Sequence, residues 1–104
     1  MATNKVDFHV FNIEDKYLQL ILNGEKRSEI RKYCLPLEGK KVGLMNNKTD
    51  KIEAIITIGI ILDLRELEDD EMEIVLDEAK VDKDFKKFYP CNYLYQIKQV
   101  ERIH

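Results

Sequence analysis

Residues 22–31 read Leu-Asn-Gly-Glu-Lys-Arg-Ser-Glu-Ile-Arg and join an apolar, helix-like run to a strand-like segment. Successive side chains of a strand point to opposite faces of the sheet. Arg27, Glu29 and Arg31 are therefore expected on one face, with the intervening residues on the other. This corner of the chain decides how the first helix meets the sheet, and it concentrates charge of both signs there.

Lys26 is expected in the turn after Gly24, where its side chain can reach the face that carries Glu29 and Arg31. The corner would then gather a carboxylate, two guanidinium groups and an ammonium. Charges of mixed sign after a helix usually form a solvated edge, whose ion pairs contribute about 0–1 kcal/mol each. The spacing alone therefore favours an ordinary surface, and a functional site needs further support.

That support comes from the spacing Gly24-x-Lys26-x-x-Glu29-x-Arg31 and the apolar run that precedes it. Together they resemble the signature of the ASCH domain family, named after a homology region of an activating signal cointegrator. The segments that follow come in the family's usual order: a loop, a Leu-x-Gly-x-x-Val segment at 37–42, a long apolar strand at 52–62 and an aromatic strand at 93–97.

The fold class expected is α+β, mainly β, in a single domain over residues 1–104. Hydrophobic periodicity predicts strands at 6–11, 41–45, 51–63 and 91–103, and helices at 13–23 and 66–80, with a further strand through the motif at 27–31. This pattern favours a small, mostly antiparallel β-barrel with about two flanking helices. The family resemblance implies a PUA-like barrel, which agrees with it.

Three local features of these elements are predicted from single residues. Asn12 is expected to cap the first helix. Val10 is expected to face inwards on the first strand, with Phe11 on the other face. Gly59 interrupts an otherwise apolar strand and is expected to mark a bulge or a bend.

The charge of the chain is unevenly distributed. The net charge of −3 argues against a protein that coats nucleic acid by general attraction. Residues 24–41 nevertheless hold six bases against three acids, whereas residues 63–84 hold eleven acids against three bases. This polarity favours a local anionic ligand over a long duplex.

The remaining composition points away from metals and membranes. Cys34 and Cys91 form no Cys-x-x-Cys pair, and His9 and His104 are isolated, so neither a metal nor another cofactor is expected. The sequence shows no signal peptide and no twenty-residue apolar run. We therefore expect a cytoplasmic, reduced protein with no membrane partner.

The first functional hypothesis follows from the resemblance, which implies binding of RNA or a nucleotide-like anion in a cleft beside the motif. The candidate ligand-binding residues are Lys26, Arg27, Glu29, Arg31 and Tyr93. Arginine can grip phosphate with two hydrogen bonds, and lysine adds a point charge. An aromatic ring such as that of Tyr93 can stack on an unpaired base.

The second hypothesis is a small hydrolase, because one branch of the family cleaves the amide of acetylated cytidine and other members are nucleases. A nuclease could use Lys26, Glu29 and Arg31 as base, acid and oxyanion partner. The amidohydrolase branch has a threonine at the position of Glu29, and it takes an acid from a later helix. Glu71 and Glu73 are the two candidates for that acid, and the sequence does not choose between them.

The third hypothesis is a protein-interaction module that uses the acidic helix at 66–80. Acidic helix faces are more often simply solvated. The sequence leaves open the identity of the ligand, whether the protein is an enzyme, and the oligomeric state.

Overall fold

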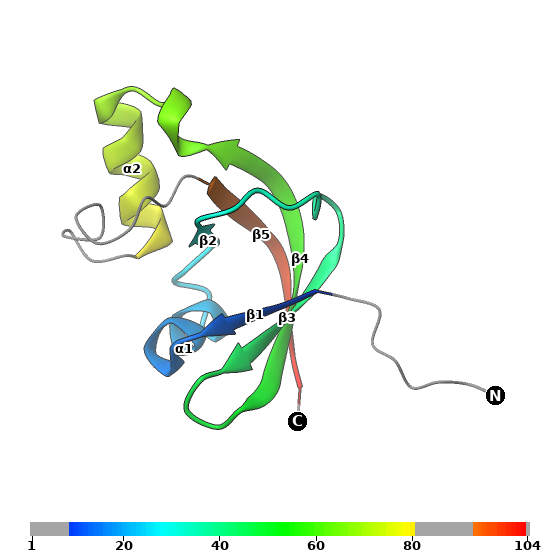
Figure 1. Ribbon diagram of the computed structural model, residues 1–104. Helices are drawn as coiled ribbons and strands as arrows, with labels where there is room; N and C mark the ends of the chain where they lie inside the picture. The colour runs from blue at the N-terminus through cyan, green and yellow to red at the C-terminus, as the bar shows by residue number, and fades with distance from the viewer. Residues whose placement is uncertain (1–8, 81–92, 104) are drawn as a thin grey trace.

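The computed structural model describes residues 9–80 and 93–103, which form one curled sheet of five strands with two helices beside it (Figure 1). The strand order is β1-β3-β4-β5-β2; β1 runs parallel to β3, and every other pairing is antiparallel. The elements are β1 (His9–Ile13), α1 (Asp15–Leu22), β2 (Ser28–Arg31), β3 (Lys41–Asn46), β4 (Lys51–Asp63), the 3₁₀ turn η1 (Leu64–Glu66), α2 (Asp69–Ala79) and β5 (Tyr93–Arg102). The expected α+β, mostly antiparallel architecture is confirmed, in the form of an open half-barrel.

The first strand ends later than predicted. The side chains that face the interior are those that were predicted to face away from it. The strand continues to Ile13, which pairs with Asn46 of β3, so Asn12 lies within the strand and does not cap α1. Phe11 is buried and Val10 only partly so, because the ring of Phe11 packs edge-on against Tyr95, with ring centroids 5.3 Å apart. The prediction for this strand was therefore wrong in both its end and its orientation.

β4 is the central strand, and its irregularity lies at the predicted glycine. Pairing with β5 shifts register between Ile58 and Ile61. A Cβ on Gly59 would lie 2.2 Å from Oε1 of Gln96, and that oxygen accepts a hydrogen bond from the Ile60 N–H at 3.1 Å. The predicted bulge is confirmed, and it exists because the Gln96 side chain occupies the space beside Gly59.

Two hydrophobic clusters hold the helices on the sheet. The larger lies inside the curl, where α1 contributes Leu18 and Ile21. The smaller lies on the other side of β2 and β5, where α2 packs against Ile30 and Leu94. The side chains that α2 contributes are Met72, Val75, Leu76 and Ala79.

Arg31 joins the two end strands of the sheet, between which the described residues form no backbone ladder. Its Nη2 donates to the carbonyl oxygen of Asn12 on β1 at 2.6 Å and lies 2.8 Å from Oε2 of Glu29 on β2. The guanidinium carbon also lies 4.4 Å from the centroid of the Phe11 ring. One side chain of β2 therefore holds β1, the strand at the other end of the sheet, by a hydrogen bond and by stacking.

We predict that Arg31→Met lowers the free energy of unfolding by about 1–3 kcal/mol, because it removes a charged hydrogen-bond donor from Asn12 and Glu29. Methionine keeps apolar contact with Phe11, so the variant isolates the polar part of the interaction. Urea titration followed by circular dichroism measures the effect. Arg27→Met is the matched control, since Arg27 is exposed on the same segment, and it should change stability by less than about 0.5 kcal/mol. Equal effects of the two substitutions would contradict this role for Arg31.

We also predict that Gly59→Ala destabilises the protein by about 1 kcal/mol, because the new methyl group must displace the Gln96 side chain and break its bond to Ile60. In a Gln96→Ala background the same substitution should be neutral or stabilising, because alanine then restricts the unfolded chain without a clash. Thermal unfolding of the four proteins in a double-mutant cycle measures this coupling. Additive effects would show that the glycine is needed for some other reason.

Candidate functional site

Lys26 is the most buried charged residue of the motif, with 1% of its surface exposed. Its Nζ donates to the carbonyl oxygen of Ala79, the last residue of α2, and lies 3.6 Å from Oε1 of Glu29. It also lies 5.3 Å from the centroid of the Tyr17 ring. The C-terminus of a helix carries partial negative charge, so α2 presents a favourable end to this ammonium.

The turn after α1 fixes the backbone of Lys26. Gly24 has φ +85°, a conformation that side-chain-bearing residues rarely adopt, and it lets the chain reverse at once. The N–H groups of Glu25 and Lys26 both donate to the carbonyl oxygen of Leu20, at 2.9 and 3.0 Å. Lys26 is thus anchored to α1 by its backbone and to α2 by its side chain.

Glu29 lies between the two cations and is itself 7% exposed. Its Oε1 faces Lys26 at 3.6 Å, and its Oε2 faces Arg31 at 2.8 Å. We call Lys26, Glu29 and Arg31 the motif cluster. It contains two positive groups and one negative group, so the structure brings these three predicted residues together with an excess of positive charge.

Burial lowers the pKa of the Lys26 ammonium below its ordinary value, while the nearby carboxylate of Glu29 works in the opposite direction. A lysine with a lowered pKa exists more often as the neutral amine, which can act as a base or a nucleophile. The environment of Lys26 therefore suits chemistry as well as binding.

One donor of Arg31 is buried without a partner. Its Nε has no hydrogen-bond acceptor among the described residues, although Nη2 is fully engaged by Asn12 and Glu29. The guanidinium side chain keeps 28% of its surface exposed. Because Nε itself has almost no accessible surface, an incoming acceptor oxygen would meet the exposed remainder of the Arg31 side chain.

Arg27 does not join the motif cluster. Its side chain is exposed and borders a groove of about 280 Å³ between the end of α1 and β5. Lys26 lies at the same groove. Arg27 is therefore placed beside the motif cluster, at an opening that reaches towards it.

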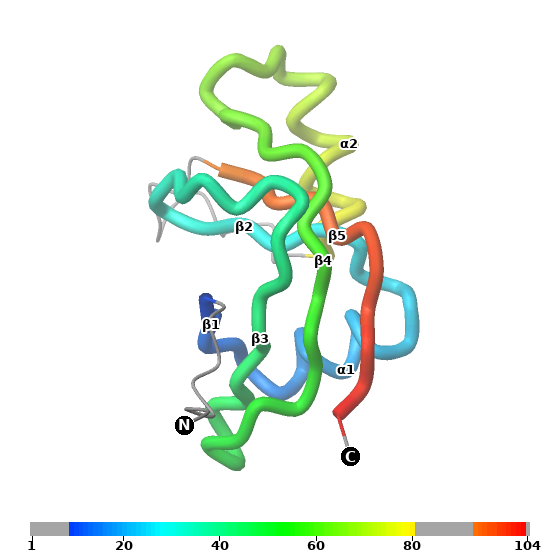
Figure 2. Tube along the Cα trace, turned by 90° about the vertical axis from the view of Figure 1, so that its right-hand side faces the viewer, coloured from blue at the N-terminus to red at the C-terminus, as the bar shows by residue number. Residues whose placement is uncertain are grey.

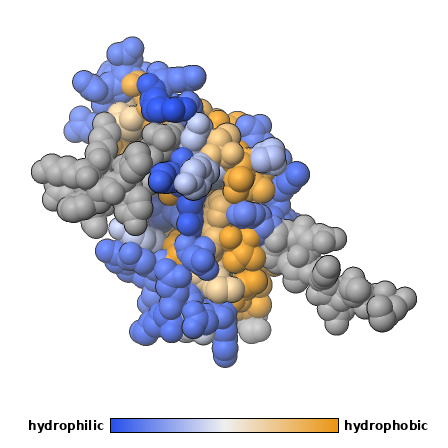
Figure 3. Space-filling model, viewed as in Figure 1, coloured by the Kyte–Doolittle hydropathy of each residue, from blue (hydrophilic) through white to orange (hydrophobic). Residues whose placement is uncertain are grey.

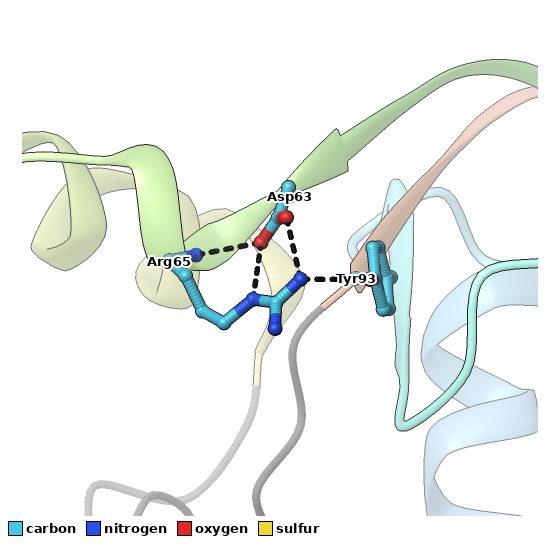
Figure 4. Close-up of polar contacts among 3 residues, drawn as sticks. All are labelled: Asp63, Arg65 and Tyr93. Atoms are coloured by element: carbon cyan, nitrogen blue, oxygen red, sulfur yellow. Dashed lines mark hydrogen bonds and ion pairs between the residues drawn. The ribbon is translucent and has the colours of Figure 1, made fainter.

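Tyr93 of β5 pairs with Arg31 of β2, but its hydroxyl interacts with Arg65. Arg65 donates from Nη2 to that hydroxyl at 2.9 Å, and it binds Asp63 through Nη2 and Nε at 2.8 and 3.0 Å (Figure 4). Tyr93 also lines a hollow of about 380 Å³ beside the loop that contains Cys34. Its ring is thus at the edge of the site, next to a different depression from the one at Arg27.

The acid expected from a later helix is not placed beside Lys26. Oε1 of Glu71 accepts the Glu68 N–H at 3.0 Å, as part of a capping box at the start of α2. Ala79 is eight residues further on, roughly 12 Å along the helix. The group that α2 offers to Lys26 is instead a backbone carbonyl, which no residue type in the sequence could signal.

The described residues hold no cluster of three or more histidine, cysteine, aspartate and glutamate side chains that could bind a metal ion. Cys34 is a free, exposed thiol. Neither helix in the described part of the chain is both long and apolar enough to cross a membrane.

Comparison with solved structures identifies the fold. No family model and no curated protein matches the sequence. The structure of ASCH from Zymomonas mobilis aligns with a TM-score of 0.74 at 14% sequence identity, covering 91% of this chain and 69% of that one. A protein from Enterococcus faecalis described under the family model DUF984 aligns with a TM-score of 0.59 at 14% identity, covering 96% of this chain and 82% of that one. At this level of identity the likeness establishes the fold alone, and the chain has the ASCH-like fold that its motif implied.

Proposed function

We propose that the protein binds RNA or a nucleotide-like anion at the motif cluster. The observation that carries this proposal is the excess positive charge of the motif cluster, in which the Nε of Arg31 has no acceptor among the described residues. A phosphate oxygen could accept from the exposed part of the Arg31 side chain and balance the charge of the cluster. A neutral ligand could accept a hydrogen bond from Arg31, but it would leave the positive charge of the motif cluster unbalanced.

The surroundings of the motif cluster support an anion of limited size. Arg27 adds an exposed cation at the neighbouring groove, and the ring of Tyr93 stands opposite Arg31 as the proposed stacking surface for a base. The outer surface of α2 is hydrophilic and strongly acidic, so it repels a long polyanion (Figure 3). The proposed ligand is therefore a nucleotide or a short single-stranded segment.

A second candidate function is hydrolysis, and the lowered pKa of Lys26 favours it. In this alternative the Lys26 amine acts as base or nucleophile on an ester or amide of a bound nucleotide. Glu29 occupies the position where the amidohydrolase branch of the family has a threonine. Because Glu29 supplies a carboxylate instead of a hydroxyl, the motif cluster suits a nuclease reaction better than cleavage of the amide of acetylated cytidine.

Lys26→Met should abolish binding of a labelled short oligouridylate or of a nucleoside monophosphate, because it removes the buried positive charge and keeps the side chain's length. Fluorescence anisotropy at two salt concentrations measures binding, and chromatography of the same mixtures detects any product. Lys40→Met is the matched control, since Lys40 is exposed on the loop before β3, and it should bind like the native protein. Product formed by the native protein and lost in Lys26→Met identifies an enzyme. Undetectable binding by the native protein, or equal binding by Lys26→Met, would refute the proposed site.

The pH dependence of stability gives an independent test of the state of Lys26. Its pKa is lower in the folded protein than the value of about 10.4 in an unfolded chain. Between those two pKa values the unfolded state binds more protons, so stability should rise with pH there. The stability of the native protein relative to Lys26→Met should therefore increase on going from neutral towards pH 10, measured by urea titration. A flat or falling difference would show that burial does not dominate the environment of Lys26.

A further inference from the structure

The second half of β5 is an open edge of the sheet. β2 pairs only with residues 93–96, and the Ile97 N–H donates to the carbonyl oxygen of Arg27 at 2.9 Å. Residues 99–102 then pair with β4 on one side, while no described strand lies on the other (Figure 2). This stretch of β5 extends beyond the short strand that covers its beginning.

The register shows which backbone groups this edge offers. The Ile103 N–H donates to the carbonyl oxygen of Glu53 on β4 at 3.0 Å, and pairing continues without interruption from Ala54 with Arg102 to Thr57 with Gln99. Hydrogen-bonded and non-bonded pairs alternate along an antiparallel ladder. The N–H and C=O groups of Val100 and Arg102 therefore point away from β4, towards the open side.

The side chains along the edge are positive and partly apolar. Arg27, Lys98 and Arg102 are exposed, and none of them forms an ion pair within residues 9–80 and 93–103. Glu101 is already paired with Lys41 at 3.3 Å. Val100 is 38% exposed. It lines the 280 Å³ groove together with Arg27.

We propose that the edge of β5 at residues 98–102 accepts an extended acidic segment of a partner protein as a sixth strand. The outward backbone groups of Val100 and Arg102 supply the pairing, and the exposed cations select acidic side chains. This surface is distinct from the motif cluster and goes beyond the function proposed there.

Two other occupants fit less well. A second copy of the chain paired edge to edge around a twofold axis would bring the cations of this edge against each other. Single-stranded nucleic acid would stack its bases on aromatic rings, and the described residues that line the groove include none. An acidic peptide satisfies both the backbone and the charge of the edge.

The probe is an acetylated peptide of alternating glutamate and valine, with a lysine–valine peptide of equal length as the control. The native protein should bind the acidic peptide in a salt-sensitive manner and fail to bind the basic one, as measured by fluorescence anisotropy. Val100→Pro removes an N–H that β4 does not use, so it should weaken binding about tenfold while keeping the sheet. Val100→Thr retains the N–H and should bind like the native protein. Lys98→Glu should weaken binding through charge alone.

A second measurement needs no variant. Binding of the acidic peptide should slow hydrogen exchange at the amides of Val100 and Arg102, and it should leave the already bonded amide of Ile103 unchanged. No binding, equal binding of the basic peptide, or displacement of the acidic peptide by oligouridylate would overturn the proposal. Equal binding by Val100→Pro, with no protection at these amides, would also overturn it. Displacement by oligouridylate would place both ligands at the groove that Arg27 borders. The other outcomes do not bear on nucleotide binding at the motif cluster, which Lys26→Met tests separately.

Discussion

The carboxylate of Glu29 is the interaction on which the rest of the structure depends. It separates two cations that would otherwise repel each other inside the protein, and each of its oxygens faces one of them. Lys26 connects this carboxylate to the end of α2, and Arg31 connects it to β1. Three segments far apart in the sequence, at Asn12, residues 26–31 and Ala79, therefore meet around one negative charge, so the position of α2 and the contact between the two end strands depend on the same group.

Local features of this arrangement could be read from the sequence. Alternation along β2 correctly placed Glu29 and Arg31 on the face opposite Ile30, and the glycine at position 24 correctly placed Lys26 in a turn from which it reaches Glu29. Gly59 correctly predicted the bulge in β4. Glycine is typical of positions where the backbone conformation or a neighbouring side chain leaves no room for a Cβ atom. The successes at Glu29, Arg31 and Lys26 depend on contacts between residues that are close in sequence.

The contacts that complete the site could not be predicted in this way. The acceptors for Lys26 and Arg31 are the backbone carbonyls of Ala79 and Asn12, which any residue could provide. Ala79 lies 53 residues from Lys26 along the chain, so only the packing of α2 brings it there. The face of β1 was mistaken because Val10 and Phe11 are both apolar, and the choice between them depends on Tyr95 from the last strand.

Residues of the motif cluster therefore serve the fold and the proposed site at once. A signature such as Gly-x-Lys-x-x-Glu-x-Arg can persist because Arg31 holds two strands, because Lys26 holds a helix, or because both bind a ligand. The atoms of Arg31 differ in this respect: Nη2 is engaged by the fold, whereas the buried Nε has no acceptor within residues 9–80 and 93–103. A purely structural arginine would gain stability if that donor were also paired within the protein. The donor without an acceptor among the described residues is therefore the part of the motif that the described fold leaves unexplained.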